Sequence, residues 1–377
     1  MLLVTVFLVT RGHGVSVSHG GKNSKTRENE KIATCGRFWY NAAEVRIMSN
    51  VTYLETGSTD PAYNLAFEEY VLTHRTQGDY LLLWQNDNTI VVGQNQNTAQ
   101  EIDPAFVKEH HITVVRRGTG GGAVYHDLGN LNYSFITDTG AAERLTMDRF
   151  TRPIVEALQN LGLNAEASGR NDILVEGRKV SGTAQRLVHG RILHHGTLLF
   201  DSRPEMIAGA LRVDQAKFTS KSAKSVKSRI GNIREFLPAD MTLPEFWEYL
   251  KRQLAGTGLV QSALMADELA QVSRLADEKY RTWEWTYGRS PKFDMVKRNY
   301  FTGGRLEVGV SVDHGSITEI RFYGDFLSLT DTTPLCRALE GVAYREDAVA
   351  AVLDSQPMAE MFGGITRDEV LRTIFNQ

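Results

Sequence analysis

Apolar and polar positions follow two distinct patterns from about residue 48 to the end of the chain. Where apolar residues return every three or four positions, the pattern predicts an amphipathic helix. Short apolar runs bounded by Gly, Asn, Asp or Pro predict strands. Helices are expected at about 61–75, 104–110, 147–161 and 243–254, and strands at 51–55, 80–84, 89–93, 112–115, 123–125, 131–136, 171–183 (two strands around a turn at 176–177) and 191–200.

Local signals at the ends of these segments support the predicted boundaries. Asp60-Pro61 and Asp103-Pro104 each place a capping carboxylate before a proline at the first helical position. Thr242 and Glu245 have the spacing of a capping box. Only Gln85 to Asn88 separates the strands at 80–84 and 89–93, a spacing that predicts a hairpin between them.

The pattern becomes irregular near 283–291, which predicts a domain boundary there. Beyond it, apolar runs at 306–312 and 317–322 flank a turn at 313–316 and predict a hairpin, followed by two helical stretches. We therefore expect one domain over 48–291 and a small α/β domain over 292–377.

The first 47 residues differ from the rest of the chain. Residues 1–10 are apolar but reach about half the length of a membrane span, and no basic region precedes them. Residues 11–31 are rich in Gly, Ser, Lys and Asn without periodicity. We expect residues 1–47 to be a disordered leader or the result of a wrongly assigned start, with Met48 beginning the folded protein.

Composition narrows the class of protein. Hydrophobic residues make up 42% and charged residues 23%, as in ordinary soluble globular proteins. With 42 basic against 45 acidic side chains, the chain carries no overall field for holding nucleic acid or an anionic membrane, and neither is an expected partner. Only Cys35 and Cys336 occur, which excludes a disulfide framework and favours a reducing compartment, the cytoplasm.

A glycine-rich segment follows the strand predicted at 112–115. Gly118 to Ala123 fits the dinucleotide fingerprint G-x-G-x-x-A, but the residues after it cannot start the helix which that fingerprint requires. A Walker P-loop is excluded as well, because no Gly-Lys-Ser/Thr follows. Bare glycine backbone beside Arg116 and Arg117 suits a phosphate or carboxylate group, and we favour this interpretation over a turn with solvated arginines.

The hairpin predicted at 171–183 carries several polar side chains. Asn171 and Asp172 precede its first strand, and Lys179 follows its turn. Adjacent strand residues point to opposite faces, so only one of Arg178 and Lys179 need be solvated. An inward Lys179 would stabilise charge that develops in phosphoryl or acyl transfer, whereas the alternative is an ordinary surface lysine.

Two further groups of basic or titratable residues are ambiguous. His194 and His195 are adjacent on a predicted strand and therefore cannot easily hold one metal ion, so each is expected to pack or to form hydrogen bonds. The stretch 217–229 holds four lysines and Arg229 without an acidic residue among these positions. A solvated face is the default interpretation, with contact to nucleotide phosphates or an acidic partner as the alternative.

Several motifs together resemble the lipoate-protein ligase family. They are Asp60–Glu69, Leu83–Gln85, Gly93–Asn97, Arg116–Asn130, Ser168–Asp172, Gly177–Gly182, His194–Thr197, Ser225–Arg229 and Gly303-Gly304. The resemblance runs from about residue 50 to the end and includes the accessory domain of the longer ligases. It implies an α+β fold: a mixed, mostly antiparallel sheet with flanking helices, shared with biotin ligases and related to class II synthetases, plus the small accessory domain.

The resemblance also implies a two-step reaction. Lipoate and ATP, with Mg²⁺, give lipoyl-AMP and pyrophosphate. A lysine of the acceptor protein then displaces AMP. The implied acceptors are lipoyl domains of 2-oxoacid dehydrogenase E2 subunits and the glycine cleavage H protein.

Site residues are carried over by motif position. The resemblance makes Lys179 the catalytic lysine. The implied ATP and adenylate site contains Arg117, Gly120, Gly121, Gly122, Ala123, Asn171, Asp172 and Lys179. The implied lipoate site contains Trp84, Arg117, Gly122, His126 and Lys179. No metal motif is present, although Asp172 is a candidate Mg²⁺ ligand.

Two positions depart from the family pattern. Thr119 stands where serine is common and keeps the hydroxyl. Gln94 stands where arginine is common, which removes a charge and argues against phosphate binding at that position.

Related activities remain as alternatives. Octanoyltransferases on this scaffold need a thiol in the acyl site, whereas Cys35 lies in the leader and Cys336 in the accessory domain. Biotin ligases carry a different glycine-arginine motif. A lipoyltransferase that accepts only preformed lipoyl-AMP or a lipoyl-protein stays open, as does a non-catalytic accessory protein, which an intact Lys179 disfavours.

Overall fold

The computed structural model describes residues 51–139, 147–169, 171–211, 229–255, 258–288 and 293–375. The leader at 1–47, the lysines of the basic stretch and the boundary predicted at residue 291 lie outside these ranges. The strands are β1 (Val51–Glu55), β2 (Asp79–Trp84), β3 (Thr89–Val92), β4 (Thr113–Arg116), β5 (Val124–His126), β6 (Asn130–Asp138), β7 (Ala165–Ser168), β8 (Asp172–Val175), β9 (Arg178–Val188), β10 (Arg191–Leu199), β11 (Leu259–Gln261), β12 (Met295–Phe301), β13 (Gly304–Asp313) and β14 (Ser316–Gly324). The helices are α1 (Pro61–His74), α2 (Thr98–Glu101), α3 (Pro104–Glu109), α4 (Met147–Asn160), α5 (Pro204–Ala210), the 3-10 helix η2 (Ile233–Phe236), α7 (Leu243–Ala255), α8 (Ala266–Leu275), the π-helical turns η4 (Ala276–Tyr280) and η5 (Glu284–Gly288), α9 (Thr333–Leu339), α10 (Glu346–Leu353), α11 (Met358–Phe362) and α12 (Arg367–Phe375).

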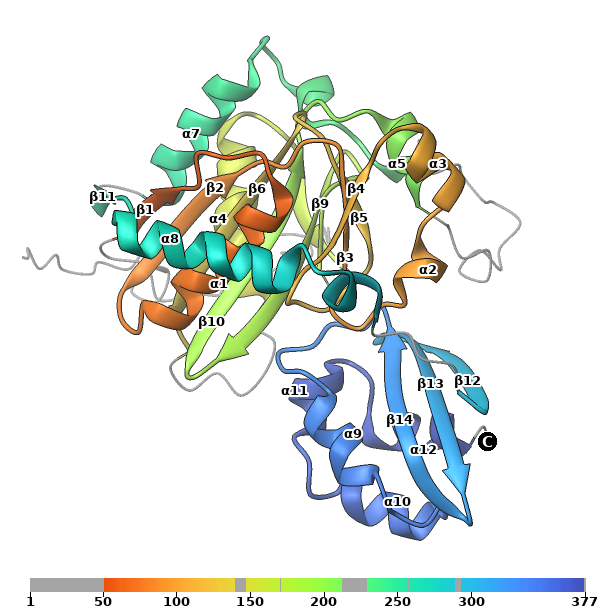
Figure 1. The fold of residues 1–377 in the computed structure, drawn as a ribbon. Coiled ribbons are helices and arrows are strands. Elements are labelled where there is room, and N and C mark those ends of the chain that lie inside the picture. Colours follow the sequence, from red (N-terminus) through yellow and green to blue (C-terminus); the bar gives the residue numbers. More distant parts are fainter. Residues whose placement is uncertain are drawn as a thin grey trace, which may run out of the picture. The chain divides into compact units, whose positions relative to one another are not determined.

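An eight-stranded sheet forms the framework of the larger part of the chain, in the order β11-β1-β2-β6-β10-β9-β8-β7. Figure 1 labels β1, β2, β6, β10 and β9 of this sheet. The β11–β1 and β1–β2 pairs are parallel, and every other pair in this sheet is antiparallel. This confirms the expected mixed, mostly antiparallel sheet with flanking helices.

Helices cover both faces of this sheet because its strands alternate apolar residues between the faces. On β2, Leu81 and Leu83 join the core that contains residues of α4 and α7. Leu82 and Trp84 join the core formed with α1 and α8. As expected, α1 begins at a capping residue, since the Asp60 carboxylate accepts a hydrogen bond from the backbone N–H of Ala62.

The hairpin predicted between the strands at 80–84 and 89–93 is wrong. Both edges of β2 are already paired, with β1 and β6 of the large sheet. The next strand, β3, therefore starts a separate three-stranded sheet, where it runs parallel to β4 and antiparallel to β5. The spacing between the two segments was short enough for a hairpin, but it did not show that β2 pairs with other strands along both of its edges.

The C-terminal region is an antiparallel sheet, β12-β13-β14, packed with helices around its own apolar core. Residues 325–375, all described, contain the four helices α9 to α12 rather than the two predicted stretches. Glycines break the helical pattern, since Gly341 and Gly363 have positive φ angles of 83° and 57°.

One segment of this region, 324–331, contacts the glycine-rich loop and its neighbours. The backbone N–H of Gly121 donates to the carbonyl of Phe326 over 3.0 Å, and the N–H of Leu187 donates to the carbonyl of Leu329 over 2.8 Å. Leu329 is buried within the core beneath the large sheet. The Gln94 amide donates to the Asp331 carboxylate over 2.6 Å. Position 94 therefore connects to the C-terminal region.

Arg116 lies at the junction of these parts and is fully buried. Its guanidinium donates to the carbonyl oxygens of Gly93, Gln94, Gln96, Trp285 and Thr286 and to the Thr98 hydroxyl, over 2.7–3.0 Å. The sequence placed Arg116 with Arg117 as a pair for anions, which is wrong for Arg116. Neighbouring side chains on a strand point in opposite directions, so only Arg117 reaches the glycine-rich loop.

The two adjacent histidines on β10 point to opposite faces, as predicted. His194 is buried against the ring of Phe150 at 4.9 Å between centroids, and its Nδ1 accepts a hydrogen bond from the Gln185 amide. Burial, with a smaller effect of the neighbouring His195, lowers the pKa of His194 to about 3. The ring is therefore neutral in the folded protein at ordinary pH.

Replacing Arg116 with Met is expected to lower the free energy of unfolding by at least about 3–5 kcal/mol, because several buried carbonyls lose their donor. Urea unfolding measures this loss. Arg281→Met is the matched control, since Arg281 is exposed and its ion pairs with Asp60 and Asp277 are worth about 0–1 kcal/mol. Equal losses in the two variants would contradict the central role of Arg116.

The neutral His194 is expected to make the protein acid-sensitive. Its folded pKa of about 3 lies below the ordinary value of 6.5, so below pH 6.5 the unfolded state binds an extra proton. The free energy of unfolding then falls by about 1.4 kcal/mol for each unit of decreasing pH, and this contribution is absent above pH 6.5. In urea unfolding between pH 4 and 6, His194→Leu should reduce the pH slope by about one proton. An unchanged slope in this variant would contradict the prediction.

Candidate functional site

A pocket opens between the glycine-rich loop, the β8–β9 hairpin and β10. Of the residues that the sequence predicted for the site, Trp84, Arg117, Gly122, Ala123, His126, Asn171 and Lys179 line it. Residues that sequence reasoning did not select also line it, among them Leu65, Val91, Asn132, Thr183, Ala184, His195 and Thr197. The predicted residues come from five separate segments, and the fold brings these segments to one cavity.

One part of the pocket wall is apolar. Leu65 of α1, Trp84 of β2 and Val91 of β3 are all buried there. The Trp84 indole N–H donates to the Ser134 hydroxyl over 2.9 Å, and its ring lies edge-on to the His126 ring. This hydrogen bond fixes the orientation of the indole, so Trp84 presents a rigid apolar surface to the cavity.

Another part of the wall carries a cation beside a carboxylate. The Lys179 Nζ lies 2.7 Å from the Asp172 carboxylate, and the Lys179 side chain is 40% exposed. Gly182 leaves room for this lysine, because a Cβ on Gly182 would lie 3.2 Å from the Nζ. Arg178 points the other way and pairs with Glu235, which confirms that the neighbouring residues face opposite sides.

Arg117 also lines the pocket, and hydrogen bonds to the glycine-rich loop hold its guanidinium in place. Its guanidinium donates to the carbonyl oxygens of Gly120 and Gly122 over 2.7 and 2.8 Å, and its Nε donates to the Thr119 hydroxyl over 2.9 Å. Burial lowers the pKa of Arg117 to about 10, which Glu68 partly offsets. The side chain therefore keeps its positive charge at neutral pH.

The glycines of the loop divide between two surroundings. Gly122 and Ala123 border the pocket. Gly120 and Gly121 instead face residues 326–328, and a Cβ on Gly120 would lie 2.8 Å from the carbonyl oxygen of Phe326. The structure therefore does not bring Gly120 and Gly121 to the pocket wall, and Asp172 reaches the pocket only through its ion pair with Lys179.

His126 offers an unused donor or acceptor to the pocket. Burial, and next the positive charge of Arg117, lower its pKa to about 3, so the ring is neutral. Its Nδ1 accepts a hydrogen bond from the Asn86 amide over 3.1 Å, which places the ring proton on Nε2. Among the described residues Nε2 has no hydrogen-bond partner, although it is buried. A polar ligand atom in the pocket would satisfy it.

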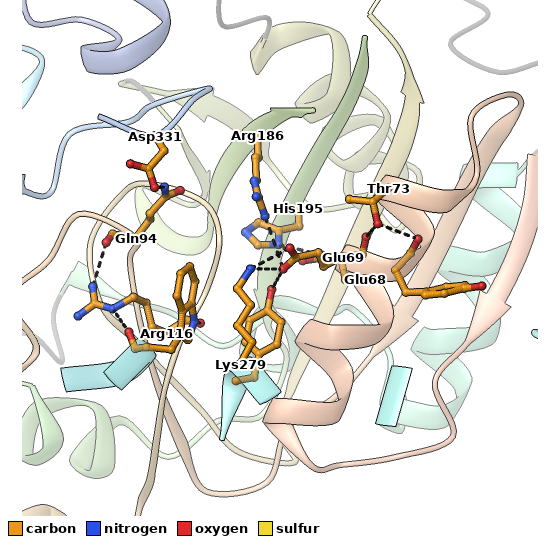
Figure 2. A network of polar contacts seen from close by, with 12 residues as sticks. Glu68, Glu69, Thr73, Gln94, Arg116, Arg186, His195, Lys279 and Asp331 are labelled. Atoms are coloured by element: carbon orange, nitrogen blue, oxygen red, sulfur yellow. Dashed lines mark hydrogen bonds and ion pairs between the residues drawn. The ribbon is translucent and has the colours of Figure 1, made fainter. Parts of the chain in front are cut away.

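Sequence reasoning missed two consecutive acidic residues of α1, both drawn in Figure 2. Glu68 is buried and accepts hydrogen bonds from the Ser134 hydroxyl and from His195. Glu69 pairs with Lys279 over 2.7 Å. Burial raises the pKa of Glu69, but the positive charges of Lys279 and Arg186 outweigh it and hold the pKa below its usual value. The available signal was the spacing of four between Asn64 and Glu68, which puts both polar residues on one side of the helix among apolar positions.

The described residues contain neither a cluster of metal-ligating side chains nor a helix that could span a membrane. No group of three or more His, Cys, Asp or Glu side chains there is placed to hold a metal ion. Asp172, the Mg²⁺ ligand expected from the sequence, forms an ion pair with Lys179. None of the described helices is both long and apolar enough to cross a membrane.

Comparison with known proteins identifies the family of this chain. A family model for the lipoyl protein ligase A/B catalytic domain matches residues 60–255, and one for the bacterial lipoate protein ligase C-terminus matches 290–374. The lipoate-protein ligase LplJ of Bacillus subtilis is 41% identical over 321 residues, which cover 84% of this chain and 97% of that protein.

Solved structures match as well. A lipoate-protein ligase A bound with ATP has a TM-score of 0.55 at 26% identity and covers 64% of this chain and 99% of that one. A chain from a bipartite ligase and E2 lipoyl domain of Thermoplasma acidophilum also has a TM-score of 0.55, at 28% identity, and covers 65% of this chain and 99% of that one. On its sequence matches over most of its length, the chain belongs to the lipoate-protein ligase family.

Proposed function

We propose that this ligase activates lipoate with ATP to form lipoyl-AMP and then transfers the lipoyl group to a lysine of an acceptor protein. The observation that carries the proposal is the pocket itself, where an apolar wall at Trp84 continues into a polar wall with Arg117 and Lys179. Such a cavity suits a long apolar acid joined to a phosphate. A solved lipoate-protein ligase A bound with ATP supports the use of this nucleotide.

In the first step, the lipoate carboxylate attacks the α-phosphorus of ATP, a P–O bond to pyrophosphate breaks and a mixed anhydride forms. Both reactants are anions, so the reaction needs positive charge. Arg117 and Lys179 supply it, and Asn171 with Gly122 and Ala123 border the adenylate. Asp172 would hold Mg²⁺, which offsets phosphate charge when bound. Gly120 and Gly121 remain predicted contacts of the adenylate.

In the second step, an amine of the acceptor attacks the lipoyl carbonyl, the C–O bond to AMP breaks and an amide forms. Lys179 stabilises the oxygen that gains charge. Trp84 borders the lipoyl chain, and His126 donates from Nε2 to a polar atom of the substrate. No covalent bond to the enzyme is needed.

The acceptor is proposed to be a lipoyl domain of a 2-oxoacid dehydrogenase E2 subunit or the glycine cleavage H protein. The relative from Thermoplasma acidophilum, described together with an E2 lipoyl domain, supports the first of these. The sparse cysteines support action in the cytoplasm. The separate family matches at 60–255 and 290–374 support a catalytic domain over 48–291 and an accessory domain over 292–377.

Lipoate-dependent exchange of pyrophosphate with ATP tests the activation step directly. The wild-type chain should catalyse this exchange without any other protein, and Lys179→Ala should slow it by at least about 100-fold. Folding should change little, because a partly exposed ion pair contributes about 0–1 kcal/mol.

The matched control is Arg178→Ala, which removes the neighbouring cation on the opposite face and should leave the exchange rate near that of the wild type. Two results would oppose the proposal. Substantial exchange by a folded Lys179→Ala variant rejects the role of the lysine. A wild-type chain that transfers only preformed lipoyl-AMP identifies a transferase instead.

Trp84→Val is expected to enlarge the apolar part of the pocket, weaken the use of lipoate and admit bulkier carboxylates. Competition between lipoate and a bulky aryl-alkyl carboxylate in the exchange assay measures the change. Trp283→Val, at an exposed tryptophan, should keep the wild-type preference. If Trp84 only fills the core, its replacement lowers stability and leaves the preference ratio unchanged.

A further inference from the structure

We propose that the buried carboxylate of Glu68 is a positioning group for Arg117, acting through His195 and the hydroxyl of Thr119. The inference rests on the proposed function, in which Arg117 is one of the two cations that offset the charge of the reactants. Glu68 and Thr119 do not border the pocket, whereas Arg117 and His195 do.

The contacts form a continuous chain. His195 Nδ1 lies 2.9 Å from the Glu68 carboxylate, and His195 Nε2 lies 2.8 Å from the Thr119 hydroxyl. Arg117 Nε donates to that same hydroxyl over 2.9 Å. Figure 2 shows Glu68 of α1 beside His195 of β10.

One arrangement of hydrogens satisfies every contact. An ionised Glu68 only accepts, so His195 Nδ1 carries the proton and Nε2 accepts. The Thr119 hydroxyl then donates to Nε2 and accepts from Arg117 Nε. The carboxylate thus fixes the tautomer of His195, the tautomer fixes the hydroxyl, and the hydroxyl fixes the plane of the guanidinium.

The order carboxylate, imidazole, hydroxyl is also that of nucleophilic triads. Burial argues against such a role here. Thr119 is 1% exposed and does not line the pocket, and its oxygen already accepts from Arg117. A nucleophile must reach the carbonyl it attacks. The geometry instead fits a role of Thr119 in positioning Arg117.

The same carboxylate also acts on the apolar wall. The Ser134 hydroxyl donates to Glu68 over 2.6 Å and accepts from the Trp84 indole over 2.9 Å. Ser134 and His195 are direct partners across β6 and β10, so a helical carboxylate above this pair reaches both. Glu68 therefore connects to two groups that line the pocket, Arg117 and Trp84.

The chain of contacts depends on a hydroxyl at position 119 and on no other property of threonine. Thr119→Val keeps the shape but removes the acceptor for Arg117 Nε, so the guanidinium loses one of its fixed contacts. Thr119→Ser keeps the hydroxyl. Thr373 is the matched control, because its buried hydroxyl likewise donates, to the Glu369 carbonyl, and accepts, from Asn299.

The test measures KM for ATP and kcat in lipoate-dependent pyrophosphate exchange, with the thermal midpoint of each variant. Thr119→Val should raise KM for ATP by about 10-fold or more, the scale of a hydrogen bond to a charged group. Thr119→Ser and Thr373→Val should stay within about twofold of the wild type. An unchanged KM in Thr119→Val, or an equal rise in Thr119→Ser, overturns the proposal.

A second variant separates coupling from simple destabilisation. Glu68→Gln removes the charge that orients His195 and should also raise KM for ATP, although Glu68 does not border the pocket. Combined with Thr119→Val, it should add little to the larger single effect, because both act through one ring. If the fold-changes multiply instead, the two residues act independently and the relay is rejected.

The design distinguishes this failure from failure of the proposed function. If the wild-type chain catalyses no exchange, the function is wrong. If it does, and Glu68→Gln keeps the wild-type KM for ATP, only the relay is wrong. The KM of Glu68→Gln for ATP therefore tests the relay even if Thr119→Val does not fold.

Discussion

The burial of one guanidinium, that of Arg116, is the constraint on which the site depends. A buried cation is tolerated only where donors and acceptors match, and here the acceptors are carbonyls at 93–96 and 285–286 together with the Thr98 hydroxyl. These carbonyls lie after β3 and in the π-helical turn η5, outside any sheet. By binding these carbonyls, Arg116 holds the two segments in one conformation. It also holds the end of β4 in place, because Arg116 is the last residue of that strand.

The position of Arg117 follows from that of Arg116 at the end of β4. Because side chains alternate on a strand, an inward Arg116 forces the next guanidinium toward the glycine-rich loop. Arg117 then binds the loop's own carbonyls, and Thr119, His195 and Glu68 continue the network to α1. Arg116, a structural cation, and Arg117, a proposed functional cation, are therefore adjacent in sequence but point in opposite directions. Contacts within the protein define the conformation of the glycine-rich loop.

The sequence was informative wherever the signal was local. Capping residues located α1, and alternation correctly separated Lys179 from Arg178 and His194 from His195. Strand pairing depends on segments far apart in the sequence, so the residues near Gln85 did not show that β2 and β3 belong to different sheets. Glu68 escaped notice because a glutamate on a helix is ordinarily solvated. Only the tertiary fold shows it buried opposite Ser134 and His195, and the place of Gly120 against Phe326 likewise depends on residues two hundred positions away.

The burial of Leu329 has a consequence for how the protein unfolds. This side chain belongs to the C-terminal region in sequence, yet it completes the core beneath the large sheet, and its carbonyl accepts from the N–H of Leu187 at the end of β9. Withdrawing the C-terminal region would open a cavity in that core and leave a backbone donor unpaired. The segments matched by two separate family models thus share part of one hydrophobic core, so loss of order in the C-terminal region removes packing from the larger one.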